Sequence, residues 1–158
     1  MATGMRASAV ADAALRARSG RDGMDKEWVA VLQHVPLFES LSRRHLRRVA
    51  ACARTRRFED GAAIVRAGQT GSTFYVVLEG EAAVSAAGGR GVRLRAGDYF
   101  GEMALLDGAP RSADVRAVGE VVAMEIGRTA FARMLKQEPQ IALALLRTLA
   151  GRVRRLEG

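Results

Sequence analysis

Between Phe58 and Ile126, short apolar segments alternate with glycine-containing turns, and this pattern constrains the fold more than any other feature of the chain. The segments are residues 63–65, 74–78, 82–84, 92–94, 113–118 and 121–126. Short strands at intervals of about 8–12 residues predict an antiparallel sandwich or barrel. The strands do not alternate with helices, so a parallel sheet is not expected.

Apolar residues at helical spacing precede this region. An amphipathic helix is predicted from Asp25 to Leu32, and Pro36 interrupts it. Ser40 or Ser42 is then expected to cap a second helix that runs to about Ala53.

A second helical region follows the strands. Thr129 is expected to cap a first helix, and Pro139 to begin another that continues to the end of the chain. One apolar stripe marks the last helix, formed by Ile141, Leu145, Leu149 and Val153.

Composition narrows the function classes. The 158 residues carry a net charge of +8, and nearly all of the positive charge is arginine. This charge favours an anionic partner such as a phosphate ligand, nucleic acid or an acidic membrane surface. Cys52 is the only cysteine, so no internal disulfide can form, and a reducing, cytoplasmic location is expected.

Several other classes are disfavoured. No apolar run approaches the roughly 20 residues of a membrane-spanning helix. One cysteine and two histidines do not make a zinc site of the usual kind. No Ser/His/Asp or Cys/His catalytic set is recognisable, so a binding module is expected rather than an enzyme.

The most informative local chemistry lies in residues 99–115, YFGEMALLDGAPRSADV. Gly101 and Glu102 open a short helix-like run, whose first N–H groups suit an anion, and Gly101 lets a ligand approach the backbone. Arg111 can bind phosphate oxygens in a bidentate fork, and Ser112 adds a hydroxyl donor. Glu102 would repel a bare anion but can accept hydrogen bonds from sugar hydroxyls. A phosphate with a neighbouring ribose would use both the cation and the carboxylate. The alternative interpretations are that Arg111 is an ordinary surface arginine and that Glu102 is a carboxylate at a helix N-terminus.

The stretch FGEMALLDGAPRSADV resembles the phosphate-binding cassette of cyclic nucleotide-binding domains. Such domains occur in the bacterial catabolite activator protein, in regulatory subunits of protein kinase A and in cyclic-nucleotide-gated channels. Three flanking stretches resemble the same family: VPLFESLS, GQTGSTFYVVLEGEAAV and AGDYFGE. The resemblance covers about Val35 to Leu156.

The resemblance implies an α+β fold, in which a jelly-roll-like antiparallel β-roll of about eight strands lies between N-terminal and C-terminal helices. The expected organisation is a flexible basic leader at 1–24 and one domain at 25–158. Within that domain, helices are expected at 25–54, the β-roll at 55–127 and the C-terminal helices at 129–157.

The resemblance also implies roles for individual residues. Glu102 would hold the ribose 2′-hydroxyl and Arg111 the cyclic phosphate. The phosphate cradle would be completed by Ser112 and by the backbone of Gly101, Met103 and Ala104. Val92 would touch the base, and the C-terminal helix would close as a lid through Arg152, Arg155 or Leu156.

Three positions depart from the family pattern. Ser72 stands where an aspartate is usual, and no aromatic residue follows Phe131 to cap the base. Asp114 stands where a neutral residue is usual. Its carboxylate would share a strand face with Ser112, and it is expected to weaken phosphate binding or to tie up Arg111.

The function that the resemblance implies is that of a sensor, with cAMP as the ligand and cGMP as the alternative, no cofactor, and an effector that the sequence does not identify. A homodimer through the C-terminal helix is a further expectation. Because the chain ends at Gly158, too few residues follow the lid helix for a helix-turn-helix, and direct sequence-specific DNA binding is not expected. Two alternatives stay open: a degenerate copy that acts as a ligand-free protein-interaction domain, and the sensor fragment of a channel or transcription regulator.

Overall fold

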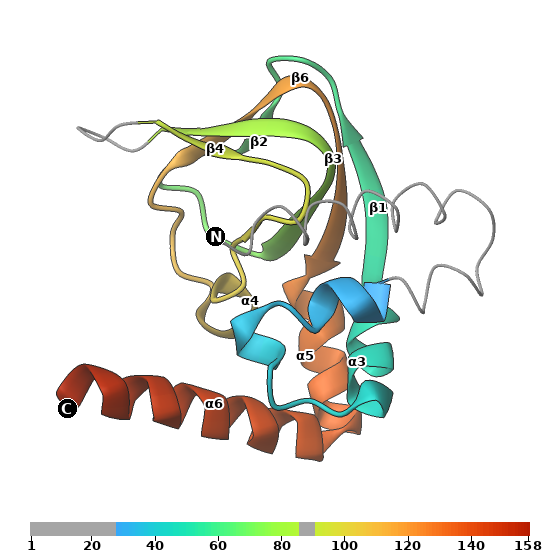
Figure 1. Cartoon of the computed structure of the whole chain (residues 1–158), viewed down its shortest axis with the longest axis vertical. Helices are drawn as coiled ribbons and strands as arrows, with labels where there is room; N and C mark the ends of the chain where they lie inside the picture. The colour runs from blue at the N-terminus through green and yellow to red at the C-terminus, as the bar shows by residue number, and fades with distance from the viewer. Residues whose placement is uncertain (1–27, 86–90) are drawn as a thin grey trace.

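The computed structural model describes residues 28–85 and 91–158 (Figure 1). The expected leader at 1–24 lies outside the described residues. In the view of Figure 1 the strands curl into a roll at the top, and the longer helices lie below it.

One antiparallel sheet of six strands accounts for the strands of the described chain. Its members are β1 (Ala53–Phe58), β2 (Ala63–Val65), β3 (Thr73–Ser85), β4 (Val92–Leu94), β5 (Tyr99–Phe100) and β6 (Asp114–Gly127). The order is β1-β6-β3-β4, with β2 paired to β6 and β5 to β3. The expected antiparallel roll between helices is therefore confirmed.

The sheet has fewer strands than the eight expected, because two pairs of predicted segments are single bent strands. Segments 74–78 and 82–84 both belong to β3, and 113–118 and 121–126 both belong to β6. Each strand bends at a glycine with a positive φ, 88° at Gly80 and 73° at Gly119. The register between β3 and β6 also shifts on either side of Glu79, so the strands change direction without a turn.

Within the described residues the N-terminal helical region ends earlier than expected, and residues 25–27 of the first predicted helix lie outside this part of the chain. Residues 28–32 are helical, η2 (Pro36–Phe38) is a short 3₁₀-helix, and α3 spans Arg43–Ala50. Ser42 caps α3, since its hydroxyl accepts the His45 amide at 3.2 Å. The prediction that this helix runs to about Ala53 is wrong, because Ala53 already pairs with Ile126 as the first residue of β1.

After the sheet come α5 (Arg128–Gln137) and α6 (Pro139–Glu157). The expected cap at Thr129 is wrong: α5 begins after Gly127 and has no side-chain cap. The Arg128 amide instead donates to Ser72 O at 2.7 Å, so a neighbouring loop supplies the acceptor. None of the described helices is long and apolar enough to cross a membrane.

Alternation along the strands divides the core in two. One face of β3 and β6, including Phe74, Val76 and Met124, packs against the helices. The opposite face, including Tyr75 and Val115, points into the roll. This inner face forms one wall of the cavity described next.

Candidate functional site

A cavity of about 300 Å³ lies between the inner face of the roll and the segment from Gly101 to Ala113. This volume is at the lower end of the roughly 300–1,000 Å³ of small-molecule pockets. The segment contains α4 (Ala104–Asp107), which ends at Gly108 in the left-handed conformation. Six of the eight predicted site residues line the cavity: Gly101, Glu102, Met103, Ala104, Arg111 and Ser112.

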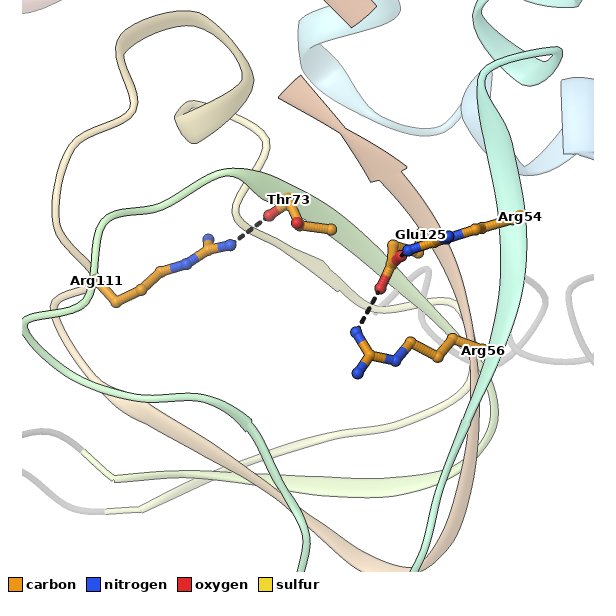
Figure 2. Close-up of polar contacts among 5 residues, drawn as sticks. All are labelled: Arg54, Arg56, Thr73, Arg111 and Glu125. Atoms are coloured by element: carbon orange, nitrogen blue, oxygen red, sulfur yellow. Dashed lines mark hydrogen bonds and ion pairs between the residues drawn. The ribbon is translucent and has the colours of Figure 1, made fainter. Parts of the chain in front are cut away.

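Arg111 is the cation of this cavity. The side chain is half-buried, and its Nη2 donates to the backbone oxygen of Thr73 (Figure 2). Burial lowers the pKa of the guanidinium, while the Tyr75 hydroxyl acts in the opposite direction. Within the described ranges, no carboxylate forms an ion pair with it. A guanidinium that has lost solvent without gaining a counter-ion favours an anionic ligand.

Two glycines leave the space that Arg111 occupies. Gly101 has a φ of 82°, and a Cβ there would overlap the Arg111 guanidinium and lie 2.7 Å from Thr73 O. A Cβ at Gly71 would lie 2.8 Å from Ala104 Cβ. Neither position can carry a side chain without moving its neighbours, so the glycines allow the loop, the cassette and the guanidinium to pack together.

Backbone hydrogen bonds fix the chain on either side of Arg111. Its amide donates to Gln69 O and its carbonyl accepts the Gly68 amide, both at 2.8 Å. The Gly71 amide donates to Ala109 O at 3.0 Å. The loop between β2 and β3 is therefore paired with the end of the cassette.

Asp114 does not tie up Arg111. Its Oδ1 accepts the Ala67 amide at 2.7 Å, and among the described residues it makes no ion pair with the arginine. Asp114 is also not one of the residues that line the cavity. The expectation that this carboxylate occupies the arginine is wrong, because the side chain is engaged by the neighbouring loop.

Two polar side chains of the cassette are open, whereas the carboxylate of Asp107, which also lines the cavity, already accepts the Ala109 amide at 2.9 Å. The half-buried carboxylate of Glu102 and the exposed hydroxyl of Ser112 have no hydrogen-bond partner among the residues that the structure describes. The Glu102 and Met103 amides likewise donate to no described group, whereas the Ala104 amide already donates to Gly101 O at 3.1 Å. The cavity thus combines one guanidinium, one free carboxylate, one hydroxyl and open amides.

The opposite wall is apolar. It includes Val65, Val84, Leu94, Phe100 and Val115. The Phe100 ring stacks on that of Tyr75 with 5.1 Å between centroids. A flat ring system would be favoured on this wall by burial of its apolar surface.

Two of the predicted site residues lie outside the cavity lining. Val92 is 57% exposed. In this part of the sheet the cavity is lined instead by Val84, which is the cross-strand partner of Val92, and by the nearby Leu94. Leu94 follows Val92 by two positions, so strand alternation is the signal that could have found it. Arg152 lies on α6, which runs along the bottom of Figure 1, away from the roll (Figure 1). Contact of Val92 with a base, and closure of the C-terminal helix as a lid through Arg152, stay predictions.

Sequence reasoning also missed an ion cluster in which one buried carboxylate is paired with two exposed arginines. The Glu125 side chain is 5% exposed and lies between two arginines of β1, with Arg54 Nε at 2.6 Å and Arg56 Nη1 at 3.0 Å (Figure 2). Burial raises the pKa of Glu125, but the hydrogen bonds from Arg56 and Arg54 outweigh it and hold the pKa below its usual value. The cluster joins β1 to β6. Separately, no group of three or more His, Cys, Asp or Glu in the described chain is arranged to hold a metal ion.

The sequence is similar to regulatory proteins of known kind. It is 36% identical over 104 residues to a cAMP-dependent protein kinase regulatory subunit of Hypocrea atroviridis, covering 66% of this chain and 22% of the relative. It is 42% identical over 92 residues to the same kind of subunit from Mycosarcoma maydis, covering 56% of this chain and 18% of the relative. The match thus spans about a fifth of the length of these relatives.

Solved structures agree with the sequence relatives. The N-terminal domain of a transcriptional regulator from Streptomyces coelicolor A3(2) superposes with a TM-score of 0.71 at 29% identity, over 80% of this chain and 94% of that one. The regulatory domain of Toxoplasma gondii PKA, determined with cAMP, gives 0.63 at 31% identity, over 83% and 50%. The family model described as the cyclic nucleotide-binding domain matches residues 55–138, more than half of the chain. With the β-roll, the cassette and this match in agreement, the chain belongs to the cyclic nucleotide-binding domain family.

Proposed function

We propose that the chain is a regulatory domain that binds cAMP in the cavity around Arg111. The observation that carries this proposal is the half-buried Arg111 guanidinium, which lines the cavity and has no counter-ion in the described part of the chain. A cyclic phosphate would supply the missing negative charge in a charge-assisted pair.

The remaining groups suit the rest of the nucleotide. Glu102 would accept a hydrogen bond from the ribose 2′-hydroxyl, which explains a carboxylate in a site for an anion. Ser112 and the amides of Glu102 and Met103 would donate to phosphate oxygens. The purine would lie on the apolar wall that includes Val84 and Leu94.

The role is regulatory rather than catalytic. Relatives with similar sequences are named regulatory subunits, and a solved neighbour was determined with cAMP. We propose a role in cytoplasmic signalling, in which ligand binding acts on an effector. A ligand shifts a conformational equilibrium only through its different affinities for the two states.

The C-terminal helix α6 is the element proposed to move. Its first half is anchored in the core by Ile141 and Leu145, whereas Val153 and Leu156 near its end are 52% and 88% exposed. The apolar stripe is therefore only partly used in this conformation. Movement of this end over the cavity would bury the exposed residues and bring Arg152 toward the ligand.

A thermal-shift panel on the whole chain tests the binding function. A ligand at about 100 times its dissociation constant stabilises the fold by about 2.7 kcal/mol, which is roughly 5–11 °C for a chain of this size. We expect such a shift with cAMP, a shift of similar sign with cGMP, and a much smaller one with the acyclic 5′-AMP. No shift with either cyclic nucleotide at millimolar concentration would contradict the proposal and favour a ligand-free interaction domain.

A further inference from the structure

We propose that Asp114 is a positioning residue for the nucleotide site: by accepting the Ala67 amide, it holds the loop before β3 against the cassette and so fixes the backbone of Arg111. This inference rests on the proposed function, because the benefit of holding Arg111 is ligand affinity.

The bond lies where the regular strand pairing stops. β2 ends at Val65, which pairs with Val115 after a register shift. Beyond this point the Ala67 amide donates to no backbone oxygen of the described chain. The Asp114 carboxylate, at the first residue of β6, supplies one at 2.7 Å.

The loop that Asp114 holds is the same loop that binds the main chain of Arg111. Gly68 donates to Arg111 O and Gln69 accepts from Arg111 N, each at 2.8 Å. The Asp114–Ala67 bond closes this pair of segments at the end next to the sheet. Without it, the loop is held to the cassette only by the backbone bonds that lie farther from the sheet. The backbone of Arg111 can then rotate, and a small rotation there moves the guanidinium at the end of the long side chain.

Charge does not argue against this role. The carboxylate points to the loop, and Asp114 is absent from the residues that line the cavity. Ala113 and Val115 on either side of it do line the cavity. The negative charge is therefore directed to a backbone dipole outside the wall that would face a phosphate.

The chain offers a matched control in Asp60. Its Oδ1 accepts the Gly119 amide at 2.8 Å, which also joins a turn to β6 across a long stretch of sequence. Asp60 does not line the cavity, and its loop has no bond to Arg111. Removing either carboxylate breaks one bond of the same kind, but only one of the two bonds adjoins the site.

The test compares three variants of the whole chain by calorimetric titration with cAMP. Because charge-assisted hydrogen bonds are the stronger kind, we expect Asp114→Ala to weaken binding roughly tenfold. Asp114→Asn keeps the Oδ1 acceptor, so it should stay within about threefold of the parent, and Asp60→Ala should bind as the parent does. If Asp114→Ala does not fold, Asp114→Val, which suits a strand, replaces it.

A second measurement separates this inference from the ligand assignment. Amide hydrogen exchange without nucleotide should be faster at Gly68 and Arg111 in Asp114→Ala than in the parent, and unchanged at these amides in Asp60→Ala. Unchanged exchange at both amides, or an alanine variant that binds as tightly as the parent or more tightly, would overturn the role of Asp114. A parent that binds no cyclic nucleotide would overturn the proposed function, while the exchange comparison would still decide whether Asp114 holds the loop.

Discussion

Gly101→Ala should separate backbone strain from damage to the nucleotide site. Gly101 has a φ of 82°, a conformation that costs a residue with a Cβ roughly 1–2 kcal/mol. Gly61 has nearly the same φ, 78°, yet a Cβ there would meet nothing within 4 Å. Gly61→Ala is therefore the control that carries the strain alone.

The added methyl group at Gly101 has less room. It would lie 2.7 Å from the backbone oxygen of Thr73 and would overlap the Arg111 guanidinium. The guanidinium can move because it ends a flexible side chain, but the carbonyl belongs to β3 and cannot. Overpacking of this kind typically costs about 1–3 kcal/mol. With the strain included, we expect a loss of about 2–5 kcal/mol for Gly101→Ala and about 1–2 kcal/mol for Gly61→Ala.

Urea unfolding and cAMP titration of both variants provide the assay. Gly101→Ala should unfold more easily than Gly61→Ala and should bind cAMP at least tenfold more weakly than the parent, since the methyl group displaces Arg111. Gly61→Ala should bind as the parent does. Equal destabilisation of the two variants, or parental affinity in Gly101→Ala, would refute the packing of Gly101 against Arg111.

Three further predictions concern the rest of the fold. The pKa of Glu125 is held below its unfolded value, so its contribution to stability is complete above about pH 4.3 and is lost as the pH falls through the lower, folded value. Urea melts from pH 7 to 3 should therefore show that Glu125→Gln is less stable at pH 7 and loses less stability in acid; an acid dependence equal to that of the parent would reject the role of the ion cluster. Ser42→Ala removes the cap of α3 and should cost about 1 kcal/mol, or roughly 2–4 °C in Tm by calorimetry, and an unchanged Tm would count against the cap. Val153→Asp, at an exposed position of α6, should change stability by no more than about 0.5 kcal/mol but abolish the homodimer expected through this helix. Light scattering measures that outcome, and a monomeric parent would reject the homodimer.

The elements that sequence reasoning found are those whose signals are local. β2 and β4 are short apolar segments bounded by glycines or polar turns, and α4 is framed by Gly101 and Gly108. Arg111 and Ser112 follow α4 after the short stretch of residues 108–110, so the cassette that brings polar groups to one cavity is contiguous in the chain. For these residues, order along the chain was sufficient to predict that they would share a site.

The elements that were missed depend on partners far along the chain. The sequence of β1, ARTRRF, has neither helical nor strand periodicity of its own. Most of its residues are exposed in the structure. It becomes a strand because it pairs with β6, where Arg54 lies opposite Glu125. The carbonyl that holds Arg111 belongs to Thr73 in β3, and the amide that Asp114 accepts belongs to Ala67. No local pattern reports such contacts, because they form only when the sheet folds.

The most direct measurement of the central claim is a calorimetric titration of cAMP into the parent chain and into Arg111→Ala. We expect a single saturable site in the parent. Removal of the guanidinium should cost about 2–5 kcal/mol of binding, a loss of roughly 30-fold to several thousand-fold in affinity. Binding of Arg111→Ala with the affinity of the parent would show that the phosphate lies elsewhere, and absence of binding in the parent would show that this cavity does not take the nucleotide.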